Sequence, residues 1–449
     1  MRGVAPAVVL LLGAALAPVA VLEDGERDAL RAAPARARVV PPTDLPSSAA
    51  PTAHTSTRPA RAAAVERLLQ ERARAVVERD RRAFLATVDP SAGALVARQA
   101  ASFDALAEVP LGSWDYVLEP GTGSPPDDRL DRRYGQGSWW GPTVTLRYAI
   151  AGFDERPVVV DQHLTFVLRD GRWLLGADDD FAAQGRVTPR AIWDRGPVVA
   201  VRTGGVLVLG HPGQRGLLGQ VAALTAAAVP RVTAGWGSWR ERVVVLVPAD
   251  AQELAGLLGS DADLSRIAAM ATAELRGGEG EYDPAGDRVL VNPETFVGLG
   301  EVGRQVVLTH EVTHVATRRA SGPAVPGWLA EGFADLVGYT GVDLPLSVTA
   351  ADLASEVRAG RTPPALPVDA DFEGGSPRLS QAYQEAWLAV RLLDERSGRA
   401  ALLRFYRAVG ARRGVPSATA VEDALRAELG TTTAALTADW RASLSRRFA

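Results

Sequence analysis

The 449-residue chain contains no cysteine and no lysine, and it has one asparagine and five histidines. The absence of cysteine excludes disulfide bonds, thiolate metal ligands, a cysteine nucleophile and a lipid anchor on an N-terminal cysteine. Any metal ion must therefore be held by histidine or carboxylate side chains. All 49 basic residues are arginine. We interpret this bias, together with the rarity of asparagine, as a preference for GC-rich codons rather than as chemistry.

The charge of the chain gives no support to a nucleic-acid partner. The 53 acidic residues outnumber the arginines, the formal net charge is −4 and the isoelectric point is about 5.9. Phosphate binding requires clustered surplus cations, which this balance does not supply. With 47% apolar residues, the chain is long enough for two or three packed domains. The sequence leaves the oligomeric state open.

The first 61 residues differ in composition from the rest. One arginine precedes an apolar run over residues 3–22, and three acidic residues follow within five positions. This charge distribution predicts a membrane segment, residues 1–30, with the bulk of the protein outside the cytoplasm. The segment is either an uncleaved signal anchor at the cell membrane or a cleaved signal peptide of a secreted protein. Residues 31–61 are rich in alanine and proline and predict a linker, in which His54 has no expected role.

Residues 62–186 predict an α+β domain. An amphipathic helix begins at Ala62, strand-like segments follow, and Asp170-Gly171 has the composition of a two-residue hairpin turn. Through ERDRRAFLA in the helix and DGRWLL in the hairpin, this stretch resembles the cone-shaped ketosteroid-isomerase-like (nuclear transport factor two) superfamily, which implies a helix packed on a curved antiparallel sheet. Domains of this superfamily often present a pocket and as often serve as accessory domains, so the sequence leaves the role of this one open. Three polar groups here are interpreted as a strand face and a solvated loop: His163, Asp161 and Asp178–Asp180.

Residues 187–449 predict a second α+β domain with a sheet-bearing half and a helical half. GPVVAVRTGGVLVLGHP indicates a Gly-Gly hairpin, RGLLGQVAALTAAAVPRVTAGWG a helix, and ERVVVLVPA and DRVLVNPETF strands. From residue 300 to the end, the pattern is almost entirely helical. The junction of the two halves carries the segment VVLTHEVTHVATRR, residues 306–319.

This junction segment has the spacing of a metal site. His310 and His314 lie four residues apart, so on a helix their imidazoles project from adjacent turns of one face and can bind one ion. Glu311 lies about 100° around the helix, which is too far for a ligand but close enough to act on a water beside the ion. Apolar residues on the opposite side predict that the back of this helix is buried.

A second helix supplies the carboxylates that such a site needs. Two prolines end the first helix, and GWLAEGFADLVGY follows with Glu331 and Asp335 on one face. A catalytic zinc site requires a third protein ligand and an open position. We therefore predict Glu331 as the third ligand and Asp335 as the carboxylate that fixes a ligand histidine through its ring N–H.

The two segments together resemble the gluzincin group of zinc metallopeptidases, in particular the bacterial peptidase MA-like domains. The likeness rests on HEVTH, the sixteen residues after it, and Glu331 within GWLAEGFAD. It implies that Zn²⁺ is bound by His310, His314 and Glu331, that Glu311 is the catalytic acid and base, and that the zincin-like fold covers residues 187–449. One position departs from the pattern, because Ala330 stands where many gluzincins have asparagine.

The resemblance implies further site features. In the resembling enzymes an edge strand before the histidine helix binds extended substrate through its backbone, and DRVLVNPETF occupies that place. Asn292 is then either a cleft residue or a strand-ending turn residue. In such enzymes a tyrosine or histidine from the helical half usually stabilises the oxyanion. Tyr383 is the first candidate and Tyr339 the second, and a structural role for Tyr383 is equally open. His211 is interpreted as incidental.

The predicted function is a zinc-dependent peptidase that acts on a peptide or protein outside the cytoplasm. Water activated by the metal would attack the peptide bond, with Glu311 as general base and then general acid. The alternative is a membrane-tethered binding or scaffold protein that retains the peptidase fold without its activity.

Overall fold

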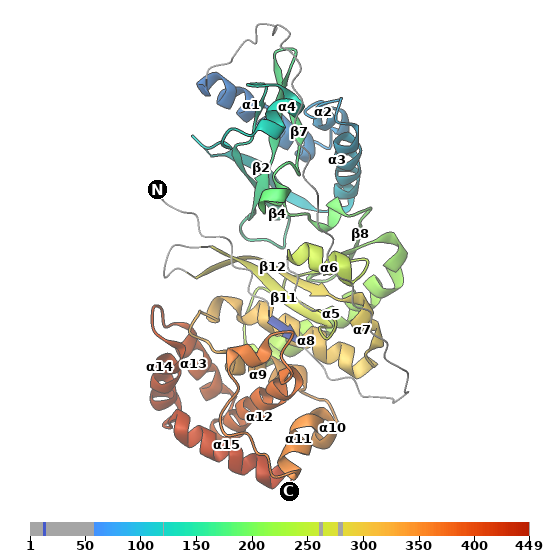
Figure 1. The fold of residues 1–449 in the computed structure, drawn as a ribbon. Coiled ribbons are helices and arrows are strands. Elements are labelled where there is room, and N and C mark those ends of the chain that lie inside the picture. The colour runs from blue at the N-terminus through green and yellow to red at the C-terminus, as the bar shows by residue number, and fades with distance from the viewer. Residues whose placement is uncertain (1–11, 15–57, 120, 260–263, 277–281, 449) are drawn as a thin grey trace, which may run out of the picture.

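A computed structural model describes residues 12–14, 58–119, 121–259, 264–276 and 282–448, arranged as two parts stacked end to end (Figure 1). Most of the predicted linker and of the predicted membrane segment lies outside the described residues; residues 58–61, predicted as the end of the linker, instead form the first turn of helix α1 (Arg58–Val77). Of residues 1–30, the structure describes only Leu12–Ala14, which form the short strand β1. The membrane segment therefore stays a prediction.

The first part, up to about residue 186, combines helices with two three-stranded antiparallel sheets. Its helices are α1 (Arg58–Val77), α2 (Arg81–Leu85), α3 (Gly93–Ala105) and α4 (Asp128–Tyr134). One sheet has the order β2-β4-β5, with bounds Leu111–Leu118, Thr143–Ile150 and Val158–His163. The other has the order β3-β6-β7, with bounds Trp139–Trp140, Thr165–Arg169 and Arg172–Ala177. The ketosteroid-isomerase-like fold of this part stays a prediction.

The predicted hairpin turn is confirmed. Strands β6 and β7 pair antiparallel with Arg169 opposite Arg172, so Asp170 and Gly171 form a two-residue turn. Both residues have positive φ, 47° and 79°, which is the backbone that such a hairpin turn requires. Aspartate and glycine tolerate this conformation better than other residues do.

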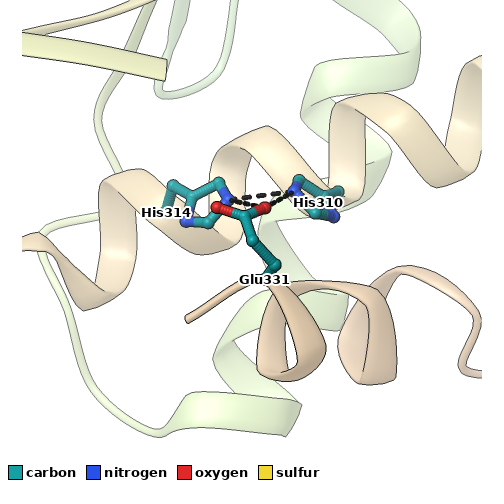
Figure 2. A group of neighbouring side chains, drawn as sticks. All are labelled: His310, His314 and Glu331. Atoms are coloured by element: carbon teal, nitrogen blue, oxygen red, sulfur yellow. Dashed lines mark hydrogen bonds and ion pairs between the residues drawn. The ribbon is translucent and has the colours of Figure 1, made fainter. Parts of the chain in front are cut away.

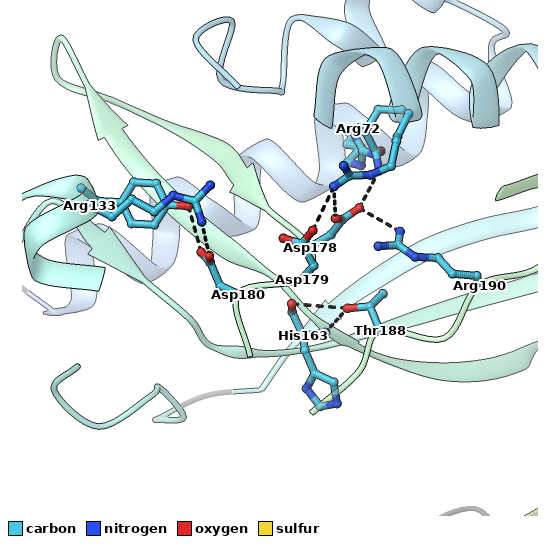
Figure 3. Close-up of polar contacts among 11 residues, drawn as sticks. Arg72, Arg133, His163, Asp178, Asp179, Asp180, Thr188 and Arg190 are labelled. Carbon is cyan, nitrogen blue, oxygen red and sulfur yellow. Dashed lines mark hydrogen bonds and ion pairs between the residues drawn. The ribbon is translucent and has the colours of Figure 1, made fainter. Parts of the chain in front are cut away.

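The loop after β7 is not the solvated loop that the sequence predicted. Asp178 and Asp180 are 2% and 4% exposed. Asp178 accepts hydrogen bonds from Arg98 (2.7 Å) and Arg190 (2.8 Å), and Asp180 accepts them from Arg133 and Tyr134 (Figure 3). The prediction failed because arginines from distant segments cover these acids, and residue spacing alone does not indicate such pairing. Between them, Asp179 is exposed as expected.

A six-stranded mixed sheet forms the centre of the second part, in the order β1-β11-β12-β10-β9-β8. Its remaining strands are β8 (Val199–Thr203), β9 (Val206–Gly210), β10 (Val243–Val247), β11 (Ala269–Arg276) and β12 (Asp283–Val291). β8 and β9 form the predicted Gly-Gly hairpin, with Thr203 opposite Val206. β9, β10 and β12 run parallel, whereas β11 runs antiparallel to β12, and β1 runs antiparallel to β11.

The expectation that DRVLVNPETF is an edge strand is wrong. β12 pairs with β10 on one side and with β11 on the other, so it is an interior strand. The strand that displaces it from the edge, β11, begins AMATA, and alanine has a weak preference for strands. The residue pattern of β11 therefore does not predict a strand.

Opposite faces of this sheet pack on different partners. Val206 and Val208 of β9 face a large core that also contains apolar residues of helices α5 (Arg215–Trp236) and α8 (Glu301–Thr317). Leu207 and Leu209, which alternate with them, pack in one cluster with Trp114 of the first part. Because a strand presents alternate residues to opposite faces, the sheet joins the two parts through a shared apolar layer.

Helix α5, with the turn before it, is long and apolar enough to cross a membrane. The apolar segment, which includes the turn before α5, is Pro212–Trp236. Among the described residues it is the one helix that meets this criterion. It contacts β8, β9 and α8 in the core of the second part. By its place in the fold, α5 is a core helix.

Two short helices belong to the sheet-bearing half: α6 (Ala251–Leu258), which packs on β11 and β12, and α7 (Pro293–Gly298), which follows β12. After α8, the helical half contains α9 (Gly327–Gly338), α10 (Leu346–Thr349), α11 (Ala351–Arg358), α12 (Leu379–Ser397), α13 (Arg399–Gly410), α14 (Ser417–Ala424) and α15 (Thr433–Phe448). α9 packs against both α8 and α12. A Cβ on Gly332 of α9 would lie 2.3 Å from the carbonyl oxygen of Ala386, so glycine is what allows α9 to approach α12 so closely.

Candidate metal centre

Helix α8 holds its two histidines rigidly because its other faces are also buried. Leu308 and Val312, on the side away from the histidines, are fully buried in the main core. His310 and His314 are themselves 0% and 2% exposed. Burial on all sides leaves their imidazoles few alternative rotamers, which is what a preformed site requires.

Helix α9 brings Glu331 to these histidines, as the sequence predicted. Its Oε2 lies 3.1 Å from Nε2 of His310 and 3.3 Å from Nε2 of His314, and the two Nε2 atoms are 2.9 Å apart (Figure 2). Glu331 is 2% exposed. The three side chains therefore direct three electron-pair donors at one point in the protein interior.

Asp335 lies one turn further along α9 and contacts the other ring nitrogen of His310. Nδ1 of His310 donates to Oδ1 of Asp335 over 2.8 Å. This contact fixes the tautomer that carries the proton on Nδ1, so the lone pair of Nε2 points at the common centre.

The charges of the cluster shift the pKa values of its members. Burial alone would lower the pKa of His310, but the carboxylates of Asp335 and Glu331 raise it well above its ordinary value. For His314, burial lowers the pKa. Burial alone would raise the pKa of Glu331, but His314 and His310 lower it to about 2. Glu331 is therefore held as a carboxylate, the form that binds a cation.

The donor set fits zinc. Two imidazoles and one carboxylate make up a frequent ligand set of catalytic zinc sites. Ligand atoms about 2.0–2.1 Å from a tetrahedral ion lie about 3.3 Å from one another. The 2.9–3.3 Å separations here are close to that value. With three protein ligands, a fourth position is left for water or substrate.

Glu311 is fully buried and lies beside the convergent donors. Its negative charge acts on the pKa values of both His310 and Tyr383. Glu311 is therefore a buried negative charge close enough to His310 and Tyr383 to raise both pKa values.

Tyr383 of α12 lies in the same cluster. Its ring centroid is 6.0 Å from that of His310 and 5.3 Å from that of Phe372, and it is 4% exposed. Burial and the neighbouring carboxylates raise its pKa well above the ordinary value, so it keeps its proton and can donate a hydrogen bond. The second candidate, Tyr339, stacks on Trp387 at 4.4 Å and belongs to the packing of α9 on α12.

Three other polar residues singled out by the sequence, Asn292, His211 and His163, lie in local contacts away from the donors. Asn292 caps α7, since its side chain accepts from the backbone N–H of Glu294 and donates to the carbonyl of Leu264. It is thus the turn residue rather than a cleft residue. His211 contacts the carbonyl of Pro197 and the carboxylate of Glu253. The backbone of His163 pairs with Thr188 (Figure 3). His54 lies outside the described residues.

Sequence comparison gives no family for this chain. No protein-family model matches it, and no curated protein matches it. The solved structures that are similar to it include two zinc metallopeptidases. One is a crystal structure of a mutant M1 zinc metallopeptidase from Deinococcus radiodurans with a Tyr-Ser-Ala substrate: 18% identity, 63% of this chain and 59% of that chain covered, TM-score 0.29.

The other is a two-domain M1 zinc metallopeptidase mutant bound to L-tryptophan: 18% identity, 62% and 58% covered, TM-score 0.29. The chain thus spans less than three fifths of the length of either structure. A likeness at this TM-score does not establish a shared fold, so the function must be argued from the residues of the site itself.

Proposed function

We propose that this protein is a zinc-dependent peptidase. The observation that carries the proposal is the convergence of Nε2 of His310, Nε2 of His314 and Oε2 of Glu331 within 3.3 Å of one another, with Glu311 beside them. Asp335 orients His310 for this role. Without an ion, a proton on His310 offsets the negative charges of Glu331 and Asp335, and a divalent cation would take the place of that proton.

The residues of the site divide the chemistry among them. When bound, zinc would lower the pKa of a water molecule and polarise a carbonyl oxygen. Glu311 would take the proton from the attacking water and then return it to the leaving amine, so that it ends the cycle as it began. The hydroxyl of Tyr383 would donate a hydrogen bond to the oxygen that gains negative charge. Burial of the whole cluster strengthens each of these interactions.

The outer edge of β11 supports a peptide as the substrate. Leu12–Ala14 pairs there as an antiparallel strand, with Leu12 opposite Ala271 and Ala14 opposite Ala269, and it contacts α8 (Figure 1). An extended peptide can therefore be held between this edge and the histidine helix by backbone hydrogen bonds. We propose that a substrate takes the place of β1.

The proposed location is outside the cytoplasm, and it rests on the composition of residues 1–30. The same residues cannot span a membrane and pair with β11 at once. Insertion of the segment into a membrane would therefore free the β11 edge for substrate. The location can be tested by fusing a reporter enzyme after residue 61. If the proposal is right, a reporter that is active only outside the cytoplasm will show activity in this fusion.

Cleavage of a diverse peptide library by the full-length protein tests the function. We expect cleavage that stops when a chelator removes the metal and returns when zinc is restored, since the ligands are preserved without the ion. The cut positions would also define the specificity. A zinc-loaded protein that binds library peptides without cutting any would instead support a binding or scaffold role.

A further inference from the structure

Arg318 is a fully buried cation one turn beyond the metal ligands. It follows His314 by four residues at the end of α8 and is 1% exposed. A buried guanidinium requires partners, because desolvating it costs several kcal/mol in general. Its partners come from the sheet rather than from its own helix.

The guanidinium of Arg318 joins α8 to two strands. Its Nε donates to Oδ1 of Asp287 on β12 over 2.9 Å, and its Nη2 donates to the carbonyl oxygen of Ala271 on β11 over 3.1 Å. Ala271 is the residue opposite Leu12 in the pairing of β11 with β1. The contact therefore reaches the strand that lines the proposed substrate position.

A second ion pair continues from this contact into the first part of the molecule. Arg288, next to Asp287 on β12, donates to both carboxylate oxygens of Asp154 over 2.7 and 2.8 Å. Asp154 lies in the turn between β4 and β5, where it also accepts from the backbone N–H of Ile150. The chain of contacts thus runs from the β4–β5 turn through β12 to the end of the histidine helix.

Stability alone does not explain these groups. An apolar side chain of similar volume at a buried ion pair often gives equal or greater stability, whereas a hydrogen-bonded fork fixes distance and direction. The fork of Arg318 has one arm on a backbone carbonyl of β11, so it fixes where that strand lies relative to His310 and His314. A peptide paired with β11 would then reach the metal in a constant register.

We propose that Arg318 is a positioning residue, which holds the substrate-pairing strand β11 in register with the metal-binding helix α8. The proposal rests on the proposed peptidase function and adds how the substrate is aligned. The side chain of Arg318 is not one of the three that converge on the metal position, and its charge contributes to lowering the pKa of His314. Its effect passes through Ala271 and Asp287.

The test compares long and short substrates in an Arg318→Met variant of the full-length, zinc-loaded protein. For peptides long enough to pair with β11, we expect kcat/KM to fall about tenfold to a hundredfold, because a small displacement of bound substrate has effects of this size. For a blocked dipeptide too short to pair, we expect a change of less than about threefold. Zinc affinity should stay unchanged. Arg319→Gln, at the exposed neighbouring position, is the matched control and should leave both substrates unaffected.

Hydrogen exchange of the β11 amides provides a readout that does not depend on cleavage. Exchange in β11 should be faster in Arg318→Met than in wild type, and Arg318→Lys, which keeps the charge, should restore part of the protection. If kcat/KM fell by the same factor for long and short peptides, the proposal would be overturned, because a general loss of structure predicts that result. If wild type cleaves no peptide, the proposed function fails by itself, and unchanged β11 exchange in Arg318→Met would then overturn the positioning role separately.

Discussion

The molecule contains two buried acidic clusters that are built in opposite ways. In the first part, Asp178 and Asp180 each meet cations of the protein, and burial is offset for Asp178 by Arg190 and Arg98, which lower its pKa below the ordinary value (Figure 3). In the second part, Glu331 meets two histidine nitrogens that are themselves electron-pair donors (Figure 2). The first cluster supplies its own counter-charges, and the second points donors at a shared centre.

This difference separates a structural cluster from a candidate metal site. A buried carboxylate paired with arginine has satisfied its charge and has no need of an ion. Two imidazoles and a carboxylate that converge on one point are satisfied together by a divalent cation. Substitutions in the two clusters should therefore change different properties of the protein.

The largest expected effect is on zinc affinity when a ligand is lost. His314→Ala should weaken zinc binding by about a thousandfold, or about 4 kcal/mol, because one of three protein ligands disappears. Competition titration with a chromophoric chelator measures this directly. His211→Ala is the matched control, since that histidine contacts Glu253 and Pro197 away from the site. Affinity that is unchanged in His314→Ala would remove the site as described.

In the first part, we expect the reverse pattern. Asp178→Asn should lower the free energy of unfolding by about 3 kcal/mol, because Arg190 and Arg98 lose the negative charge that they share. Zinc affinity should not change. Denaturant unfolding and zinc titration on the same preparation check both statements, and a loss of zinc binding in Asp178→Asn would contradict the comparison.

A smaller effect is expected at Asp335, which touches a ligand without being one. Asp335→Asn should reduce zinc affinity about tenfold to a hundredfold, or about 1.4–2.8 kcal/mol, because His310 loses the carboxylate that fixes its tautomer. The ion should still bind with the same stoichiometry. An effect as large as that of His314→Ala would instead make Asp335 a ligand.

Only one of the two acidic clusters, the one at Glu331, could be predicted from the sequence. The four-residue spacing of His310 and His314 and the face shared by Glu331 and Asp335 are local properties of two helices, so their meeting was foreseeable. Arginine partners of Asp178 come from α3 and from residue 190, and their pairing depends on the tertiary fold. The same holds for the ion pair of Arg288 with Asp154.

The sheet order illustrates the same limit. The Gly-Gly and Asp-Gly hairpins were predicted because turn residues and strand alternation lie within a few positions of each other. β11 was missed, and with it the true neighbour of β12, because its alanines carry little strand preference. Asn292 caps α7. Its position before a proline was compatible with this role, but it was also compatible with a role in the cleft.

The smallest effect we predict concerns Glu385. This buried acid has an arginine partner, like the acids of the first cluster, but its pKa is raised. Burial raises its pKa to about 7, although Arg378 and Gln381 donate to it. A raised carboxyl pKa means that the folded state binds the proton more tightly, so wild type should lose stability as pH rises from about 4.5 to 7.

Glu385→Gln should remove this dependence and be more stable than wild type by about 1–2 kcal/mol at pH 8, with little difference at pH 4.5. Arg378 is nearly half exposed, so water can solvate it in the variant. Chemical unfolding of both proteins across this pH range provides the measurement. A variant less stable than wild type at pH 8 would show that the ion pair outweighs burial.

We propose that Glu311 moves protons beside a zinc ion held by its neighbours. Peptide turnover by a Glu311→Gln variant that carries one zinc per chain tests it most directly. We predict turnover at least about a thousandfold below wild type with zinc affinity retained, because the ligands are intact and the proton acceptor is gone. Turnover at the wild-type rate in this zinc-loaded variant would contradict the account.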